Sequence, residues 1–211
     1  MKGDMGMVTR TTLGFLLALS FLVCGCREKE TAIPDPPPEA YVYPDFGDDE
    51  YGRRWEKAAR TYDNFESIAF SVKDSDSVYL YMGLPHQVWD SEVYRQMQED
   101  RATTELHGEL FHAAAIQPDA ADAEALRLLC SRTQSFVPYR GPKNCGGYHA
   151  DWCLVWKSGG KRTIMQFCFG CCEMKATDGS SDLHCDIWDF KVFSDLLDKY
   201  RAEGTRLIRA K

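Results

Sequence analysis

The sequence predicts an α+β domain, in which a mostly antiparallel sheet is covered by two or three helices, after a signal peptide and a Pro-rich tether. Three observations support this. Hydrophobic residues make up 44% of the chain and aromatic residues 12%, enough to build a core. Short runs of alternating apolar residues are joined by turn sequences, and stretches of helical period stand apart from them. The length of 211 residues suits one domain, at residues 48–211.

The N-terminus has the pattern of an export signal. Lys2 and Arg10 precede Leu13–Val23, an uncharged apolar run of 11 residues. A hydrocarbon core of about 30 Å needs about 20 residues to span it, so this run is too short to cross a membrane and suits a signal peptide.

The end of this run resembles a bacterial lipobox. Val23 and Gly25 stand three positions and one position before Cys26, as the aliphatic and small residues of that motif do. The resemblance implies that residues 1–25 are removed and that Cys26 carries lipid, including palmitate. The chain would then be exported and anchored to a membrane of the bacterial cell envelope. Cys24 in place of Cys26 would put the bulky Val23 at the cleavage site. The alternatives are ordinary secretory cleavage beside a coincidental cysteine and, less favoured, an uncleaved membrane anchor.

Residues 26–47 predict a tether. The segment is polar and rich in proline, at Pro34, Pro36, Pro37, Pro38 and Pro44. Such a composition favours extended polyproline geometry and a semi-rigid spacer, and it also suits a disordered leader.

The first half of the domain predicts three helices and a strand pair. Apolar residues at helical spacing predict helices within residues 50–62, after Pro85, and after Pro118. Alternating apolar residues predict strands at 67–72 and 77–82, joined as a hairpin by turn residues.

The second half predicts four strands and one helix. The strands are expected at 152–157, 162–169, 172–176 and 183–188, the first two joined by Ser158-Gly159-Gly160. A C-terminal helix follows from the apolar face of Val192–Tyr200, and Gly204 is expected to end it.

Two function classes are excluded. The formal charge is −7 without a basic block, whereas nucleic-acid binding needs clustered Lys and Arg. His107, Glu109 and His112 do not form a zinc-protease motif, because the two histidines are five residues apart rather than four.

Cysteines dominate the second half of the domain. Cleavage before Cys26 and lipidation of that residue would leave seven cysteines: Cys130, Cys145, Cys153, Cys168, Cys171, Cys172 and Cys185. Six of them lie between Cys145 and Cys185, together with His149 and His184. This cluster is the candidate site.

One hypothesis for the cluster is a structural zinc site. Cys145, His149, Cys168 and Cys171 supply the four soft ligands of a Cys3His site, and Gly170 permits the tight bend between the last two. Further candidate ligands are Cys172, His184 and Cys185.

A second hypothesis is a disulfide framework, as expected of an exported domain. Seven is an odd number, so at least one thiol is left over or pairs with another chain. Connectivity does not follow from the sequence, and disulfides are compatible with a partial metal site.

A third hypothesis is thiol redox chemistry or metal handling by Cys168 and Cys171. Redox motifs of this spacing stand at a helix N-terminus, whereas this one follows a strand. A hydrolytic pairing of Cys145 or Cys153 with His149 and Asp151 is disfavoured, because these residues cannot easily converge from one short segment.

The segments Cys145–Asp151 and Cys168–Cys171, followed by a C-terminal helix, resemble an uncharacterised family of bacterial, often envelope-associated, proteins. The resemblance covers residues 120–201 and implies that the Cys-Phe-x-Cys turn is a family feature. It implies no activity. The sequence therefore predicts a lipid-anchored envelope protein with a structural Cys/His cluster rather than an enzyme, and it indicates no protein partner or substrate.

Overall fold

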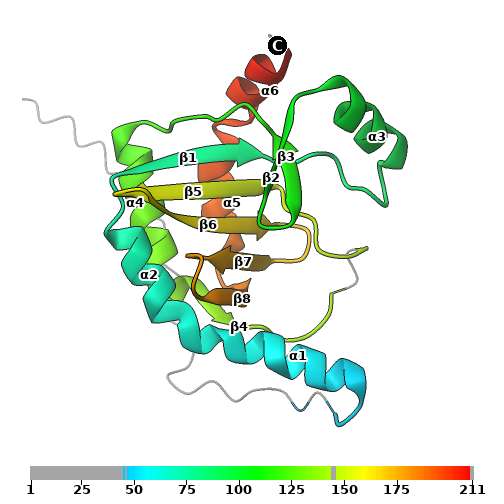
Figure 1. The fold of residues 1–211 in the computed structure, drawn as a ribbon, viewed down its shortest axis with the longest axis vertical. Helices are drawn as coiled ribbons and strands as arrows, with labels where there is room; N and C mark the ends of the chain where they lie inside the picture. Colours follow the sequence, from blue (N-terminus) through cyan, green and yellow to red (C-terminus); the bar gives the residue numbers. More distant parts are fainter. Residues whose placement is uncertain (1–44, 46, 144–145, 210–211) are drawn as a thin grey trace, which may run out of the picture. The chain divides into compact units, whose positions relative to one another are not determined.

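The domain is built on a six-stranded antiparallel sheet in the order β1-β5-β6-β7-β8-β4, as the computed structural model shows (Figure 1). The structure describes residues 45, 47–143 and 146–209. The strands of this sheet are β1 (Ser77–Met82), β4 (Phe136–Pro138), β5 (Trp152–Ser158), β6 (Lys161–Cys168), β7 (Glu173–Thr177) and β8 (Asp182–Ile187). A separate hairpin consists of β2 (Thr103–Leu106) and β3 (Glu109–His112). The helices are α1 (Glu50–Arg60), α2 (Phe65–Lys73), α3 (Ser91–Asp100), α4 (Ala120–Ser131), α5 (Phe190–Asp198) and α6 (Arg201–Arg209), with 3-10 turns η1 (Thr61–Asn64) and η2 (Thr133–Ser135). The predicted α+β class is confirmed.

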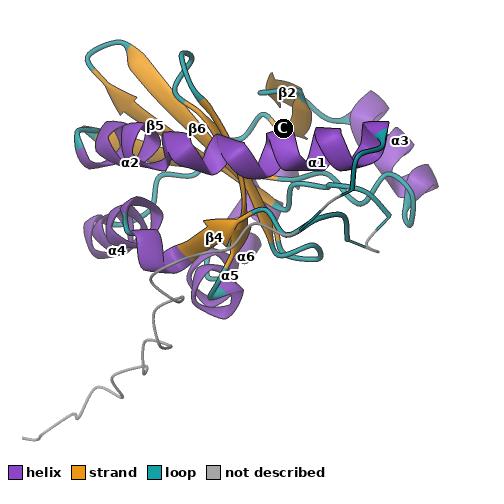
Figure 2. Cartoon of the chain, turned by 90° about the horizontal axis from the view of Figure 1, so that it is seen from below, coloured by secondary structure: helices purple, strands orange, loops and turns teal. Residues whose placement is uncertain are grey.

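The two faces of the sheet have different covers. One face carries large buried side chains such as Trp152, Trp156 and Phe167, which form the main core with α2, α4 and α5. On the other face, Cys153 and neighbouring aliphatic residues pack against the β2–β3 hairpin. Figure 2 shows α4 and α5 on one side of the strands and β2 on the other. Alternation along the strands assigns each residue to one cover or the other.

The hairpin of β5 and β6 confirms the predicted turn. Ser158 pairs with Lys161, so Gly159 and Gly160 form a two-residue loop, and both have positive φ, at 51° and 87°. L-residues with side chains rarely adopt this conformation, so the two glycines set the register of the hairpin.

Two helices begin at aspartates that cap free backbone amides. The carboxylate of Asp49 accepts a hydrogen bond from the Gly52 amide at 2.6 Å, and that of Asp119 accepts one from the Asp122 amide at 2.8 Å. The start predicted at Pro118-Asp119 is therefore confirmed. The apolar stripe expected of this helix, at Ala121, Ala125, Leu128 and Leu129, is only partly right, because Leu129 is buried whereas Leu128 is 59% exposed.

Two sequence-based expectations are wrong. Residues 67–72 form part of helix α2 rather than a strand, so the expected hairpin with 77–82 does not form. The C-terminal region forms two helices, α5 and α6, and Gly204 lies inside α6. A Cβ at Gly204 would lie 3.2 Å from Ile116 and 3.3 Å from the Met82 sulfur, so this glycine permits close packing rather than ending the helix.

Both outer strands of the sheet have limited free edges. On the outer side of β1, the amide of Leu80 donates to the Ile116 carbonyl at 2.8 Å and the Ile116 amide donates back at 2.9 Å. At the opposite edge, β4 has three residues and ends at Pro138, which has no amide proton to donate.

The predicted signal peptide, Cys26, almost all of the tether and Cys145 lie outside the described residues. Within the described part of the chain, no helix has the length and apolar character required to cross a membrane.

Candidate functional site

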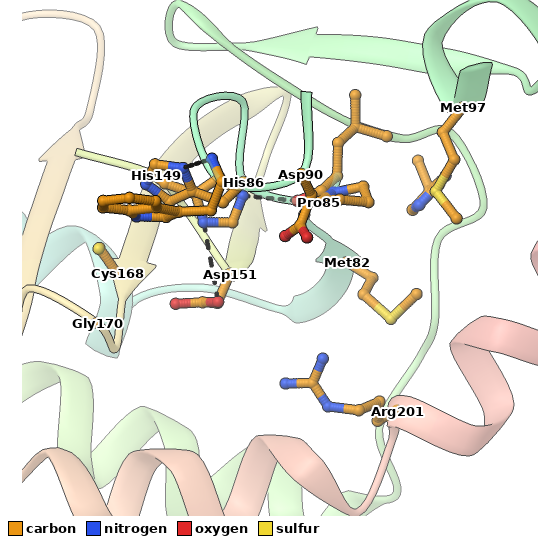
Figure 3. Close-up of a pocket in the computed structure, with 14 residues that line it drawn as sticks. Met82, Pro85, His86, Asp90, Met97, His149, Asp151, Cys168, Gly170 and Arg201 are labelled. Carbon is orange, nitrogen blue, oxygen red and sulfur yellow. Dashed lines mark hydrogen bonds and ion pairs between the residues drawn. The ribbon is translucent and has the colours of Figure 1, made fainter. Parts of the chain in front are cut away.

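A cavity of about 540 Å³ lies at the end of the sheet where β1 and β6 end and β5 begins; we call it the sheet-end cavity. It brings together three histidines, two aspartates, a thiol, two thioethers and an arginine (Figure 3). The residues that carry these groups are His86, His112, His149, Asp90, Asp151, Cys168, Met82, Met97 and Arg201.

Backbone hydrogen bonds position the floor of this cavity. The Gly83 amide donates to the Asp151 carbonyl at 2.8 Å, and the Asp151 amide donates to the Phe167 carbonyl at 2.8 Å. One carboxylate oxygen of Asp151, Oδ2, accepts a hydrogen bond from the Phe169 amide at 2.6 Å. Asp151 thereby joins β1, β5 and the turn after β6, and its second oxygen is left to face the cavity.

The ring of His149 is held in one orientation. Its Nε2 lies 2.6 Å from the Leu84 carbonyl oxygen, which can only accept, so Nε2 carries the proton. In the neutral ring Nδ1 therefore has a lone pair, and it lies 3.9 Å from Oδ1 of Asp151. Figure 3 shows His149 beside His86 and above Asp151. Two acceptor atoms facing each other in this way suit a proton donor or a cation between them.

Two other imidazoles have buried nitrogens without a hydrogen-bond partner among the described residues. The Nδ1 atom of His86 lies 3.1 Å and 3.3 Å from the amides of Val88 and Trp89 and accepts from them, so its Nε2 carries the proton; this Nε2 has no acceptor. His112 is only 2% exposed, and its Nδ1 also has no partner. Burial lowers the pKa of His112 and favours its neutral form. Buried polar atoms of this kind normally have a hydrogen-bond partner, so the two imidazoles mark this end of the sheet as a candidate polar site.

Cys168 is a buried thiol in the wall of the sheet-end cavity. Its sulfur accepts a hydrogen bond from the Cys171 amide at 3.3 Å, which closes the turn after β6. Burial raises the pKa of the Cys168 thiol, although hydrogen bonds from the backbone of His149 and Cys171 act in the opposite direction. The thiol form is therefore favoured, and Cys168 holds the His149 segment against the turn.

The state of the other cysteines is mixed. Cys171 is disulfide-bonded. The other described cysteines are free thiols: Cys130, Cys153, Cys168, Cys172 and Cys185.

The predicted ligands are only partly brought together. Cys168 and His149 line one cavity, but the His149 ring is bound to Leu84 rather than directed at a sulfur. Within residues 45, 47–143 and 146–209, no group of three His, Cys, Asp or Glu is placed to hold a metal ion. Because Cys145 lies outside these residues, the four-ligand zinc site stays a prediction.

The further candidate ligands lie elsewhere. His184 is hydrogen-bonded to Glu173 at 3.1 Å. Its neighbour Cys185 points to the opposite face of the sheet and belongs to the main core. Burial raises the pKa of the Cys172 thiol. None of the three lines the sheet-end cavity.

Sequence reasoning missed His86, His112 and Arg201 as parts of one site. They lie in a loop, in β3 and in α6, far apart in the chain, and only the tertiary structure brings them together. His86 follows Pro85 in the segment after β1, and a lone histidine in a loop has no distinctive spacing.

Comparison of the chain with protein-family models, with curated proteins and with solved structures finds no match. The resemblance of the Cys-rich segment to a bacterial envelope family therefore stays a prediction, and the assignment of function depends on the geometry of the site.

Proposed function

We propose that this chain is a lipid-anchored protein of the bacterial cell envelope whose domain binds a small polar molecule in the sheet-end cavity. The observation that carries the proposal is a pair of imidazole rings, of His86 and His112, that line this cavity and each hold a buried nitrogen with no hydrogen-bond partner among the described residues. A ligand with an acceptor for His86 and polar groups for His112 and His149 would satisfy them. A volume of about 540 Å³ suits a small molecule.

In this proposal the cysteines stabilise the fold and do not act as nucleophiles or redox groups. A nucleophilic or redox-active cysteine needs an accessible thiolate, whereas Cys168 is 2% exposed and burial raises its pKa. With Cys171 in a disulfide, Cys168 and Cys171 are not a dithiol pair. These observations weigh against the thiol-redox alternative. If Cys26 is lipidated and Cys24 is removed, Cys145 is the partner left for Cys171.

Metal handling is the second candidate function. It is suggested by His149 Nδ1 and Asp151 Oδ1, which lie 3.9 Å apart and would have to approach more closely to share one tetrahedral zinc; each side chain is fixed from behind by a backbone hydrogen bond. Such second-shell contacts are typical of zinc ligands. Zinc would be held there by His149 and Asp151 and would supply a Lewis acid. A zinc site that uses Cys171 requires the reduced protein.

Thiol and metal analysis of one sample separates these functions. We expect the full chain, purified in detergent under non-reducing conditions and then denatured, to show five free thiols, the number of free cysteines described. Peptide mapping should find Cys145 linked to Cys171, and elemental analysis should find no zinc. About one zinc per chain together with seven reactive thiols would instead establish the predicted Cys3His site and contradict the disulfide.

Ligand binding can be followed on the same oxidised protein. Trp89 lines the cavity, so its fluorescence should change when a small polar compound such as a sugar or an amino acid binds, and a Trp89→Phe variant identifies its signal. His112→Phe should weaken the change, because it replaces the polar imidazole in the cavity wall by an apolar ring of similar size. A response to zinc alone, lost in Asp151→Asn, would favour metal handling. No response to any compound would contradict both functions.

Membrane anchoring has its own test. Cys26→Ser should block lipidation and processing, and the protein should leave the membrane fraction, because hydrophobic anchoring requires the acyl chains. Cys24→Ser is the matched control and should remain in the membrane fraction. Unchanged processing and fractionation of Cys26→Ser would refute the lipobox interpretation.

A further inference from the structure

A second cavity, of about 520 Å³, lies on the hairpin-covered face of the sheet, between α1 and the strands β7 and β8; we call it the α1–β8 cavity. It shares no lining residue with the sheet-end cavity. Its walls are aromatic and charged, and are formed by Tyr51, Arg54, Trp55, Tyr139, Lys143, Tyr148, Glu173, Lys175 and His184.

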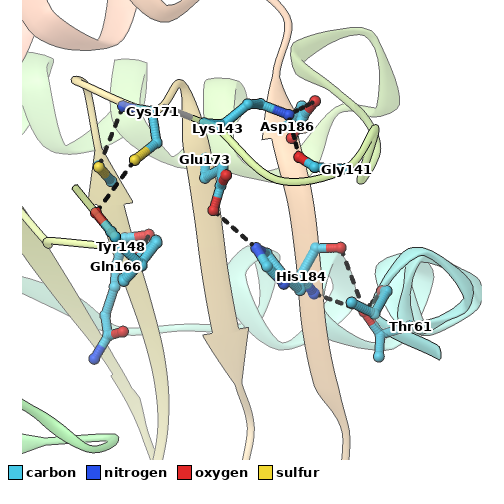
Figure 4. A network of polar contacts seen from close by, with 12 residues as sticks. Thr61, Gly141, Lys143, Tyr148, Gln166, Cys171, Glu173, His184 and Asp186 are labelled. Atoms are coloured by element: carbon cyan, nitrogen blue, oxygen red, sulfur yellow. Dashed lines mark hydrogen bonds and ion pairs between the residues drawn. The ribbon is translucent and has the colours of Figure 1, made fainter. Parts of the chain in front are cut away.

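Most polar groups of this cavity already have partners. Glu173, only 5% exposed, is bonded to His184 at 3.1 Å, as Figure 4 shows. The ring of Tyr139 stacks on His184 with centroids 4.2 Å apart. Lys143 forms an ion pair with Asp186 at 2.9 Å. These contacts hold the side chains of the cavity wall in place. They also mean that Glu173 and Lys143 already have polar partners.

Two cationic side chains of the cavity, Lys175 and Arg54, differ from these residues because they have no such polar partner, neither a hydrogen bond nor an ion pair, among the described residues. The half-buried ammonium of Lys175 lies 3.7 Å from the centre of the Tyr148 ring, which gives it a cation–π contact but no acceptor atom. A partly desolvated ammonium without an acceptor is unfavourable, so an anion would stabilise it.

The local electrostatics agree with this geometry. Burial is the main cause that lowers the pKa of Lys175, and the charge of Arg54 makes a smaller contribution in the same direction. Glu109 and Glu173 oppose this effect, but neither forms an ion pair with Lys175. An anion that contacts both cations would relieve their repulsion and desolvation together.

We propose that the α1–β8 cavity binds the carboxylate or phosphate group of a small ring-bearing molecule between Lys175 and Arg54. Tyr51 and Trp55, with ring centroids 6.1 Å apart, are the aromatic side chains of α1 that line the cavity and suit contact with a ring. The volume exceeds what a bare ion needs and lies in the range of small-molecule sites. This site goes beyond the proposed function, because it uses a different cavity and different residues.

Calorimetric titration of the full chain in detergent tests the proposal, with inorganic phosphate and benzoate as probes. At least one probe should bind. Lys175→Met and Arg54→Ala should each weaken it by about tenfold or more, because a charge-assisted hydrogen bond is lost. Lys175→Arg should retain binding. Lys57→Met, which removes a cation of the same helix outside the cavity, is the matched control and should bind like the parent.

The outcomes are distinct. Binding of phosphate alone assigns a phosphate group, and binding of benzoate alone assigns a carboxylate on a ring. Failure of both probes to bind, or equal affinity in the parent and both charge-removal variants, would overturn the proposal. If Lys175→Met does not fold, Arg54→Ala decides, because Arg54 is exposed and makes no polar contact among the described residues. The Trp89 response of the sheet-end cavity should persist in every folded variant.

Discussion

Replacing Gly83 with alanine should destabilise the domain by about 3 kcal/mol or more. A Cβ at this position would lie 2.0 Å from the Ala150 carbonyl oxygen and 3.1 Å from the Asp151 carbonyl oxygen. Both are backbone atoms, so no side-chain rotation can relieve the overlap. The chain from Ala150 to Asp151 must move away, which breaks the hydrogen bond from the Gly83 amide to Asp151.

Urea denaturation under non-reducing conditions measures this effect. Gly170→Ala is the matched control, since Gly170 lines the same cavity but a Cβ there would meet nothing within 4 Å. Its free energy of unfolding should change by less than about 1 kcal/mol. Equal stability of the two variants would show that the close approach at Gly83 is not needed. Gly83→Ala should also lose the Trp89 response, because the same segment forms the cavity floor.

Phe193→Ala should cost about 3–5 kcal/mol. The Phe193 ring is fully buried, with its centroid 5.1 Å from that of Phe167 and 5.5 Å from that of Phe136. It therefore connects α5 with strands β6 and β4, and its removal leaves a cavity between three elements.

Calorimetric melting distinguishes this loss from a weakening of helix α5. Phe190→Ala changes the same residue type in the same helix, but Phe190 is 44% exposed, so its effect should stay below about 1 kcal/mol. A similar loss in both variants would contradict the role of core packing, since alanine has a higher helix propensity than phenylalanine and neither loss could come from propensity.

The sequence predicted the β-rich half well and the region around residues 65–73 poorly, for one physical reason. Ile68, Phe70 and Val72 alternate as strand residues would, but Ile68 and Val72 are also four residues apart. In the structure these two are buried on one side of α2, whereas Phe70 is 69% exposed. A short apolar run fits both periods, and the packing of α2 against α4 decides between them. The Gly159-Gly160 turn, by contrast, predicts a hairpin and does not also fit a helix.

The candidate site was predictable only in part. The clustering of His149 and Cys168 follows from the hairpin, because one precedes β5 and the other ends β6. The contribution of His112 depends on where the β2–β3 hairpin lies over the sheet, and that of Arg201 on the break between α5 and α6. The sequence around His112 and Arg201 carries no motif that marks them as site residues. Motif spacing points to the cysteines instead and misses side chains that come from distant segments.

If the proposed lipid anchor holds copies of this chain together on a membrane surface, the covered edges of the sheet have a consequence for those copies. Exposed strand edges are templates for intermolecular β-pairing, and tethering raises the local concentration at which such pairing becomes favourable. Ile116 occupies the amide and carbonyl of Leu80 at one edge, and Pro138 limits the other. The two edges of the sheet therefore expose few unpaired N–H and C=O groups that could pair with a strand of a neighbouring copy.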